Sequence, residues 1–373
     1  MQFAPLFTVK HRVAFGVPLP FNVYNVDHTL LLARGKAIET AEQFEALMNR
    51  GVLVNLDEML DPVDVARRAP LSMLPAIWDE SRERMITVMR DPSAPDFRVR
   101  LEAACAPLEA LVERDPDLAI FQVLRQDGNP RREYGVRHSM HAAVIGLLIA
   151  RRLNWTGGDS NTAVRCALTM NLSMLDLQGV LAATAGEPNA AQRREIITHP
   201  VRSRELLEAA GITDPIWLKA VEQHHEQPDG RGYPAGLTEV CEVASLVRCA
   251  DTYAAKLSER HGRESMPADR AIRKIYMSDP DNPFSAALVK EFGIYPPGSF
   301  VALASGEAGI VIRRGTTITT PIVAALTNRY RQPLPHPVRR DTSQPGLGVS
   351  GVVNARDLPL PTKPQALAAI LAV

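Results

Sequence analysis

Hydrophobic positions recur at spacings of three and four residues through the middle of the chain. Leu101, Cys105, Leu108 and Leu111 follow this spacing, which predicts a helix with one buried face. Similar segments continue to about residue 277 without a strand pattern between them. We therefore predict an all-helical core of seven or more helices.

The first 60 residues show a different pattern. Short β-prone runs are broken by glycine and proline, and Val23 and Leu30–Leu32 fit buried strand positions. Thr40 then precedes a helical segment, with Gln43 three residues later. This spacing predicts that Thr40 caps the helix. We expect a small β-rich module whose role the sequence leaves open.

The pattern changes again towards the C-terminus. Two β-prone runs, 300–303 and 308–313, are joined by a turn-forming segment and predict a hairpin. Seven of the 29 prolines lie in residues 333–373, which predicts a loosely packed tail, with a short helix at 365–371. The predicted fold is mainly α, a multi-helix bundle. We divide the chain into four predicted parts: a β-rich module (1–60), a helical connector (61–95), a helical domain with a β-hairpin extension (96–330) and a proline-rich tail (331–373).

Charge and composition exclude several classes of protein. The 42 basic residues balance 42 acidic ones, which argues against a binder of nucleic-acid polymers. Uncharged apolar runs stay well short of the roughly 18 residues that a membrane helix needs. The four cysteines are far apart, without the paired spacing of a cysteine zinc site. We expect a cytoplasmic protein with no membrane segment.

Five of the nine histidines lie between residues 138 and 225. Two of them, His224 and His225, are adjacent and precede a segment rich in glycine and proline. Neighbouring side chains on a helix point about 100° apart, so both can face one centre only where the helix ends. Glycine and proline in the following segment supply that end.

The segment 224–237, HHEQPDGRGYPAGL, resembles the HHExxDGxGYPxGL signature of HD-GYP domains. These domains are a branch of the HD metal-dependent phosphohydrolases associated with cyclic di-GMP hydrolysis. Three further stretches match the family in order, and so does the predicted hairpin. They are YGVRHS, THPVRSRELL and RCADTYAAKLSERHGR. The resemblance covers roughly residues 120–330 of the chain.

The resemblance implies roles for particular residues. It places metal ligands at five positions, namely His138, His199, His224, His225 and Asp251. It also implies ligand contacts from a loop and from two arginines, namely Gly232, Tyr233, Pro234, Arg260 and Arg263. Structural alternatives stay open: a polar helix end for the histidine pair, an ion pair for Asp251, and solvated side chains for the arginines. His141 is assigned to packing.

The sequence departs from the family where the His–Asp pair should stand. Asn171 and Leu172 occupy those two positions, and Leu175 occupies that of the family's lysine. Two-metal phosphodiester hydrolysis usually employs a bridging carboxylate, which the resemblance places at the aspartate of the pair. Leucine cannot ligate, and an asparagine amide is a poor ligand for a metal that prefers imidazole. We therefore expect no two-metal site. Three histidines can hold one metal, so one divalent ion, Fe, Mn or Zn, remains possible at His199, His224 and His225.

Three functions follow from these residues. The first is a catalytically degenerate HD-GYP protein that binds cyclic di-GMP or the diguanylate-cyclase domain of a partner. The second is an active cyclic di-GMP phosphodiesterase that uses the remaining histidine-rich site. The third is a signalling adaptor that works through residues 1–60. Whether the protein is an enzyme is left open by the sequence.

Overall fold

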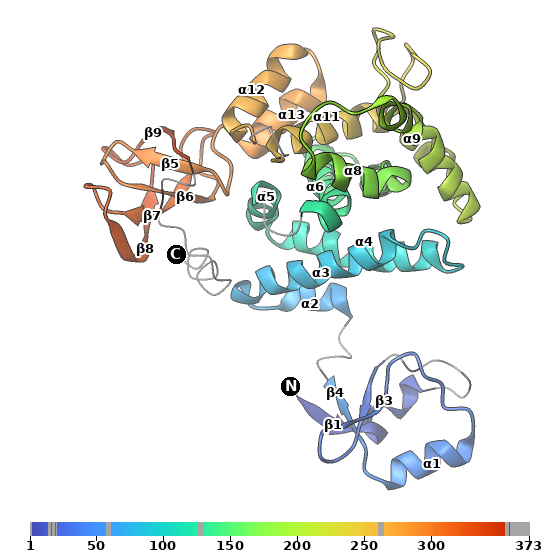
Figure 1. Cartoon of the computed structure of the whole chain (residues 1–373). Coiled ribbons are helices and arrows are strands. Elements are labelled where there is room, and N and C mark those ends of the chain that lie inside the picture. The colour runs from blue at the N-terminus through green and yellow to red at the C-terminus, as the bar shows by residue number, and fades with distance from the viewer. Residues whose placement is uncertain are drawn as a thin grey trace. The chain divides into compact units, whose positions relative to one another are not determined.

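The computed structural model describes residues 2–13, 16, 19, 21–56, 61–125, 130–259, 265–354 and 358. The chain divides into two compact units, the first ending at Arg68 and the second beginning at Ala69. Figure 1 shows both units, with the strands of the first, the helices of the second and a second group of strands near the C-terminus. Each unit has hydrophobic clusters of its own.

The first unit is built on a four-stranded antiparallel sheet in the order β1-β4-β2-β3. Its strands are β1 (Phe3–Pro5), β2 (Val23–Tyr24), β3 (Leu30–Leu32) and β4 (Leu53–Asn55). Its helical segments are η1 (Leu6–Arg12), α1 (Ala41–Asn49) and α2 (Pro62–Arg68). Thr40 caps α1 by accepting the N–H of Gln43, as the sequence predicts.

Burial in this sheet follows the position of each strand. Val23, on a central strand, is fully buried. Leu30, on the edge strand β3, leaves 56% of its surface exposed, so the prediction of a buried Leu30 is wrong. An edge strand has a neighbour on one side only, which leaves its side chains less covered.

The helices of the second unit pack around one central helix, α6. They are α3 (Leu74–Met89), α4 (Phe97–Arg114), α5 (Pro116–Leu124), α6 (Pro130–Arg152), α7 (Gly157–Thr169), α8 (Leu175–Ala183), α9 (Ala190–Ala209), α10 (Pro215–Gln223), α11 (Glu242–Leu257), α12 (Ala268–Ser278) and α13 (Pro283–Phe292). Every residue of α6 from Tyr134 to Ala150 is buried. A helix buried on all sides belongs in the middle of a core. The mainly helical fold is therefore confirmed.

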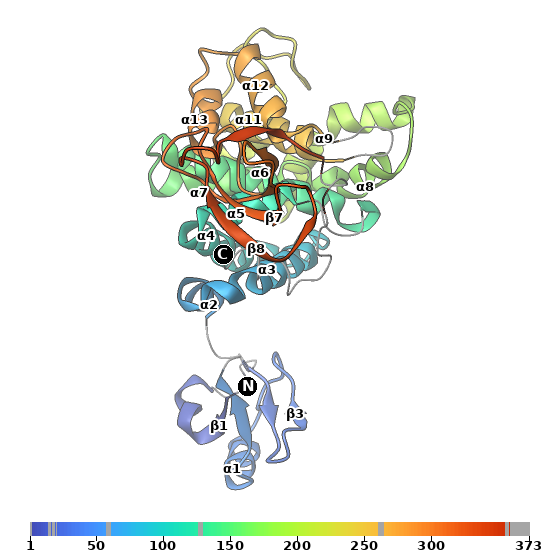
Figure 2. The ribbon, with the colours of Figure 1, turned by 90° about the vertical axis from the view of Figure 1, so that its left-hand side faces the viewer.

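Helix α3 belongs to the helical core and is not part of a connector. It buries Leu74, Ile77, Trp78 and Met85 and packs against α4 and α6 (Figure 2). The predicted connector 61–95 therefore differs from the structure, which places the break between compact units at Arg68. The prolines of this stretch fall at helix starts and in turns, where the missing N–H costs little.

The C-terminal strands form a five-stranded antiparallel sheet in the order β8-β7-β6-β5-β9. They are β5 (Phe300–Leu303), β6 (Ala308–Arg313), β7 (Ile322–Thr327), β8 (Pro333–Asp341) and β9 (Val349–Val352). The predicted hairpin is β5–β6. The predicted tail is ordered as β8 and β9 where the structure describes it, whereas the predicted helix at 365–371 lies outside the described residues.

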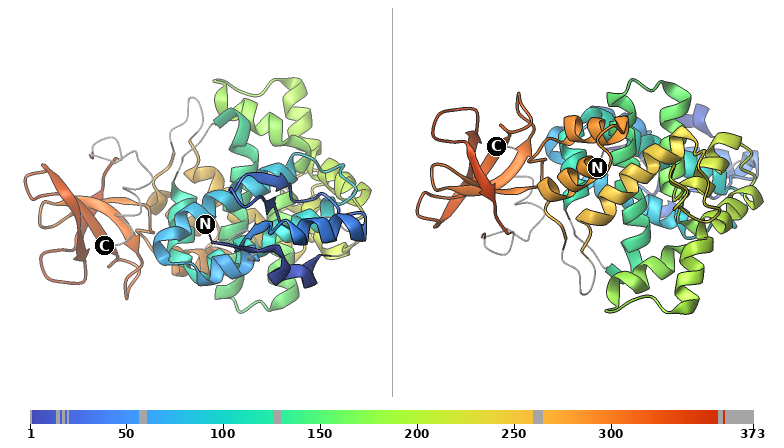
Figure 3. Two further views of the ribbon diagram at one scale, coloured as in Figure 1. Left: turned by 90° about the horizontal axis from the view of Figure 1, so that it is seen from below. Right: turned by 90° about the horizontal axis from the view of Figure 1, so that it is seen from above.

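This sheet is fastened to the helices through α5. Figure 3 shows it beside them in both views, and Phe121 of α5 shares a buried cluster with Ile310 and Leu326. Arg313 of β6 donates two hydrogen bonds to the carboxylate of Asp115, at 3.1 and 3.0 Å. The sheet therefore continues the packing of the helical unit.

One helical stretch, Gly157–Ala183, has the length and apolar composition that could cross a membrane. Of its most apolar window, 67% is buried inside the fold, and it packs against α6 and α11. Its apolar character is that of a core element.

Candidate metal centre

Three histidines meet where α9 passes the end of α10. His199 lies in the middle of α9, which begins with a capping box at Asn189. Helix α10 is capped by Asp214 and ends at Gln223, so His224 is its C-cap and His225 lies beyond it. The predicted break of the helix at the histidine pair is therefore present, and it allows two adjacent residues to face one neighbour.

The ligand nitrogens of His199, His224 and His225 all lie within 4.8 Å of one another. The Nε2 atoms of His199 and His224 are 3.1 Å apart. Both of these side chains are fully buried, whereas His225 is half-buried. Three imidazoles at this spacing match the ligand set of a single divalent metal.

The hydrogen bonds of two histidines fix their tautomers and test whether a metal fits. The Nδ1 of His199 lies 2.5 Å from the carbonyl of Ile196, and that of His224 lies 2.6 Å from the carbonyl of Val221. A carbonyl only accepts, so each Nδ1 carries the proton and each Nε2 keeps a lone pair. The two lone pairs face each other, and a cation between them would satisfy both. Metal-bound histidines are held in this way by backbone carbonyls.

Burial keeps these imidazoles neutral. Burial, together with the proximity of His224, lowers the pKa of His199 to about 3. Burial also lowers the pKa values of His224 and His225 below the ordinary range. A metal binds the unprotonated ring, so the ligands are in their binding form at neutral pH.

The second part of the predicted site is a hydrogen-bonded pair. The Nε2 of His138, on α6, lies 2.7 Å from Oδ1 of Asp251, on α11. Burial acts to raise the pKa of Asp251, but the hydrogen bond from His138 outweighs it and holds the pKa below its ordinary value. His138 Nδ1 is buried and has no hydrogen-bond partner among the described residues.

The positions of the missing His–Asp pair lie at the break between α7 and α8. Asn171 precedes the short 3-10 turn η4 (Leu172–Met174), and both Asn171 and Leu172 are buried. The amide oxygen of Asn171 has no hydrogen-bond partner within the described part of the chain. Leu175, at the lysine position, begins α8. These residues offer one neutral oxygen and two aliphatic side chains.

Two serines, which the sequence reading did not single out, hold this segment against α9. The backbone N–H of Ser173 donates to Oγ of Ser203 at 3.1 Å, and the hydroxyl of Ser173 donates to the carbonyl of His199 at the same distance. The segment at Asn171 and Leu172 is therefore attached, through Ser173, to the helix that carries His199. Serines separated by 30 residues give no local sequence signal for this contact.

The glycine-rich loop after the histidines folds back over them. Tyr233 stacks on His225, with ring centres 4.4 Å apart and planes at 23°. Gly232 lies so close to Glu226 and Gln227 that a Cβ would come within 2.4 Å of their backbone atoms, and Pro234 follows a cis peptide bond. Arg260 and Arg263, predicted to contact a ligand, lie outside the described residues. His141 is buried, as expected of a packing residue.

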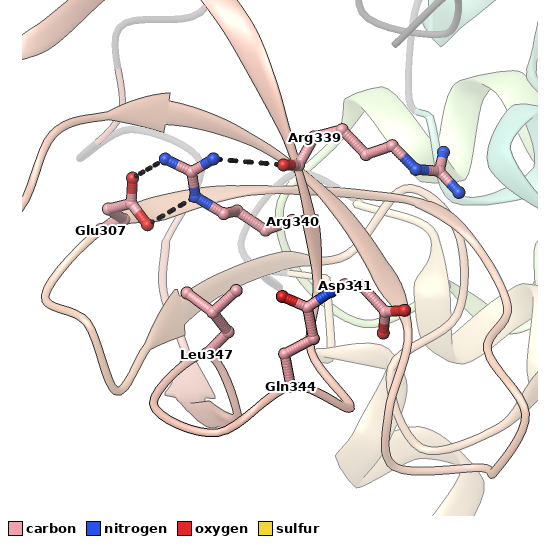
Figure 4. Close-up of a pocket in the computed structure, with 6 residues that line it drawn as sticks. All are labelled: Glu307, Arg339, Arg340, Asp341, Gln344 and Leu347. Atoms are coloured by element: carbon pink, nitrogen blue, oxygen red, sulfur yellow. Dashed lines mark hydrogen bonds and ion pairs between the residues drawn. The ribbon is translucent and has the colours of Figure 1, made fainter.

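A hollow of about 470 Å³ lies on the C-terminal sheet (Figure 4). Its lining residues are Glu307, Arg339, Arg340, Asp341, Gln344 and Leu347. Arg340 donates to both carboxylate oxygens of Glu307, at 2.9 and 2.7 Å. The guanidinium is therefore committed to an ion pair within the sheet, and the hollow contains none of the histidines.

Comparison with known proteins gives relatives from one family. The chain is 26% identical over 237 residues to the cyclic di-GMP phosphodiesterase PA4108 of Pseudomonas aeruginosa, covering 62% of this chain and 56% of that protein. It is 28% identical over 141 residues to 3'3'-cGAMP-specific phosphodiesterase 3 of Vibrio cholerae, covering 37% and 30%. The chain thus spans little more than half of the first relative and under a third of the second. No family model matches the chain.

A solved structure supports the same fold. Bd1817, an HDG"Y"P protein from Bdellovibrio bacteriovorus, superposes with a TM-score of 0.51 at 14% identity, covering 77% of this chain and 97% of that one. This likeness concerns the arrangement of helices. The two sequence relatives and the histidine-rich motif bear on the site itself. Together they support the resemblance to the HD-GYP family that the motif at 224–237 carries.

Proposed function

We propose that this chain is a catalytically degenerate HD-GYP protein of cyclic di-GMP signalling. It holds one divalent metal, Fe, Mn or Zn, at His199, His224 and His225, and acts by binding cyclic di-GMP or a diguanylate-cyclase domain. The observation that carries the proposal is the contrast between this convergent cluster and the buried, non-ligating Leu172 beside Asn171.

Catalysis by two metals is the step that this contrast argues against. Hydrolysis of a phosphodiester uses two ions about 3.5–4 Å apart to stabilise the attacking and leaving oxygens. The remaining ligands outside the cluster are His138 and Asp251, which already bind each other. Two residues without a bridging carboxylate from the Asn171–Leu172 segment are a poor second site.

The cluster itself supports a bound metal. A metal there would supply a Lewis acid that attracts phosphate oxygens. The protein's own part is to hold two rings by their Nδ1–H groups against backbone carbonyls, so that both Nε2 atoms face one point. Tyr233 adds an aromatic face beside His225, on which a base could stack.

The proposed ligand follows from the relatives. Both curated relatives are phosphodiesterases of cyclic dinucleotides by name. A degenerate site that keeps the binding residues would retain the nucleotide without cleaving it. The same glycine-rich loop is the proposed docking surface for a diguanylate-cyclase domain.

Calorimetry and a turnover assay test this proposal together. We expect the metal-loaded protein to bind cyclic di-GMP while product in the presence of Mn²⁺ or Fe²⁺ stays at the level of a metal-free control. Titration with a purified diguanylate-cyclase domain tests the second ligand, with Tyr233→Ala as the loop variant. Absence of binding to both ligands would remove the proposal.

An active phosphodiesterase is the second candidate. It is favoured by the intact three-histidine cluster and by the activity in the names of the relatives. Under this candidate, linear or mononucleotide product would accumulate with Mn²⁺ or Fe²⁺ and would disappear in a His199→Ala variant.

A signalling adaptor is the third candidate. It is favoured by the first unit, which is compact and has a core of its own around Val23 and Val54. Deleting residues 1–68 would then abolish the signalling response to cyclic di-GMP in cells while leaving metal binding by the second unit unchanged. An unaltered response after this deletion would dismiss the adaptor.

A further inference from the structure

Glu226, directly after the two histidines, is a buried carboxylate held by backbone N–H groups. Only 1% of its surface is exposed. Oε1 accepts from the N–H of Ala235 at 2.7 Å and of Gly236 at 3.2 Å, and Oε2 accepts from the N–H of Leu237 at 2.9 Å. Three such bonds satisfy a buried charge. The side chain therefore joins the start of the glycine-rich loop to its end.

The middle of the loop is also fixed to its start. The backbone N–H of Tyr233 donates to the carbonyl of His225 at 3.3 Å. The close approach at Gly232 leaves no room for a side chain. Gly230 and Gly236 have φ angles of 73° and 69°, which glycine adopts without penalty. The loop is thus folded into a ring that Glu226 closes.

The folded loop determines the orientation of His225, the least constrained of the three histidines. The rings of His199 and His224 are oriented by backbone carbonyls. Among the described residues no hydrogen bond orients the His225 ring, which instead stacks on Tyr233 and lies against His224. The position of Tyr233 depends on the loop, and the loop depends on Glu226.

We propose that Glu226 is a positioning residue for the metal centre. By clamping the loop, it places Tyr233 against His225 and so holds the third imidazole towards the other two. This inference rests on the one-metal site proposed above. It assigns a role to a carboxylate whose three hydrogen bonds all go to backbone N–H groups of the loop.

Cobalt(II) binding to the full chain tests the role of Glu226. Loss of an outer partner typically weakens metal affinity 10–100-fold, and we expect a loss in this range for Glu226→Ala. Glu226→Gln keeps one acceptor oxygen for Ala235 and Gly236 but turns an NH₂ group towards Leu237, so its loss should be smaller. Tyr233→Ala should reproduce the effect, whereas Tyr233→Phe, which keeps the stacking ring, should not.

Glu307 provides the matched control. It is also a largely buried carboxylate with both oxygens engaged, by Arg340, but it lies in the C-terminal sheet. Glu307→Gln should leave cobalt affinity and the visible spectrum of the bound cobalt unchanged. A loss of affinity equal to that of Glu226→Gln would show that Glu226 acts on general stability, and would overturn the inference.

Hydrogen exchange in the metal-free protein separates the clamp from the metal site. The amides of Ala235, Gly236 and Leu237 should exchange at least about tenfold faster in Glu226→Ala, because each loses its acceptor. Wild-type protein that binds no cobalt would contradict the proposed function, while these amides would still report on the clamp. Unchanged exchange in Glu226→Ala would overturn the inference. If the wild type binds cobalt, an equal cobalt affinity in Glu226→Ala would also overturn it.

Discussion

The two halves of the candidate site satisfy their polar groups in different ways. In the half formed by His199, His224 and His225, backbone carbonyls accept hydrogen bonds from the Nδ1–H groups of His199 and His224, and the Nε2 lone pairs of these two rings face each other at 3.1 Å. In the other half, His138 bonds directly to Asp251. The first half leaves two facing lone pairs that a cation would satisfy, whereas in the second half the carboxylate of Asp251 is already hydrogen-bonded.

The second half also includes Asn171 and Leu172, which stand where the family resemblance places a His–Asp pair. The segment at Asn171 and Leu172 is attached to α9 through Ser173 and Ser203. Its two side chains, one amide and one aliphatic group, are buried.

The largest effect is expected from removing a ligand of the first half. His199→Ala should weaken binding of Zn²⁺ or Co²⁺ by more than the roughly 100-fold that loss of an outer partner can cause, measured by competition with a chelating dye. His141→Ala is the control, because His141 is also a buried imidazole whose pKa burial lowers to about 3. Equal losses in both variants would contradict a specific role for His199.

Restoring the missing pair should change the second half. In Asn171→His/Leu172→Asp we expect metal content to rise towards two ions per chain, with cyclic di-GMP hydrolysis above the wild-type background. Without metal, the new buried carboxylate should lower the free energy of unfolding, because a buried charge needs a partner. A double variant that still binds one ion would show that restoring these two side chains is not enough to create a second metal site.

Leu172 should contribute to stability and not to metal binding. It is 6% exposed, so Leu172→Ala should lower the free energy of unfolding by about 2–3 kcal/mol through the cavity left behind. Denaturant unfolding measures this loss, with the exposed Val180→Ala as control. A fall in metal affinity would mean that the side chain also shapes the first half.

The serine contact between the halves should have the smallest effect. Ser203→Ala removes the acceptor for the N–H of Ser173 and should cost about 1 kcal/mol. Ser343, an exposed serine bonded to Asp341 at 2.6 Å, offers a comparison in which Ser343→Ala should cost less. If both cost the same, the contact does not anchor the segment at Asn171 and Leu172.

The sequence predicted the helices in which the spacing of apolar residues follows the face that is buried in the core. The four apolar positions from Leu101 to Leu111 are all buried in α4, because the spacing follows the buried face. Helix α13 was missed, although Asn282 caps it and Pro283 opens it. Strand β8 was missed because Pro333, Pro335 and Pro337 discourage a strand prediction, yet an edge strand tolerates prolines.

The candidate site shows the same limit. The motif at 224–237 located the histidines, because its residues are adjacent in sequence. The tautomers of His199 and His224, and the bonds from Glu226 to the end of its loop, depend on contacts in space. The pairing of His138 with Asp251 joins residues 113 positions apart, and no local pattern reveals it.

The most direct test of the account is the number of metal ions bound per chain. Elemental analysis of the purified protein, together with native mass spectrometry after titration with Zn²⁺ or Mn²⁺, measures this number. The account predicts one ion per chain in the wild type and none in His199→Ala. Two ions per chain in the wild type would contradict it, because the second half would then hold a metal despite Asn171 and Leu172.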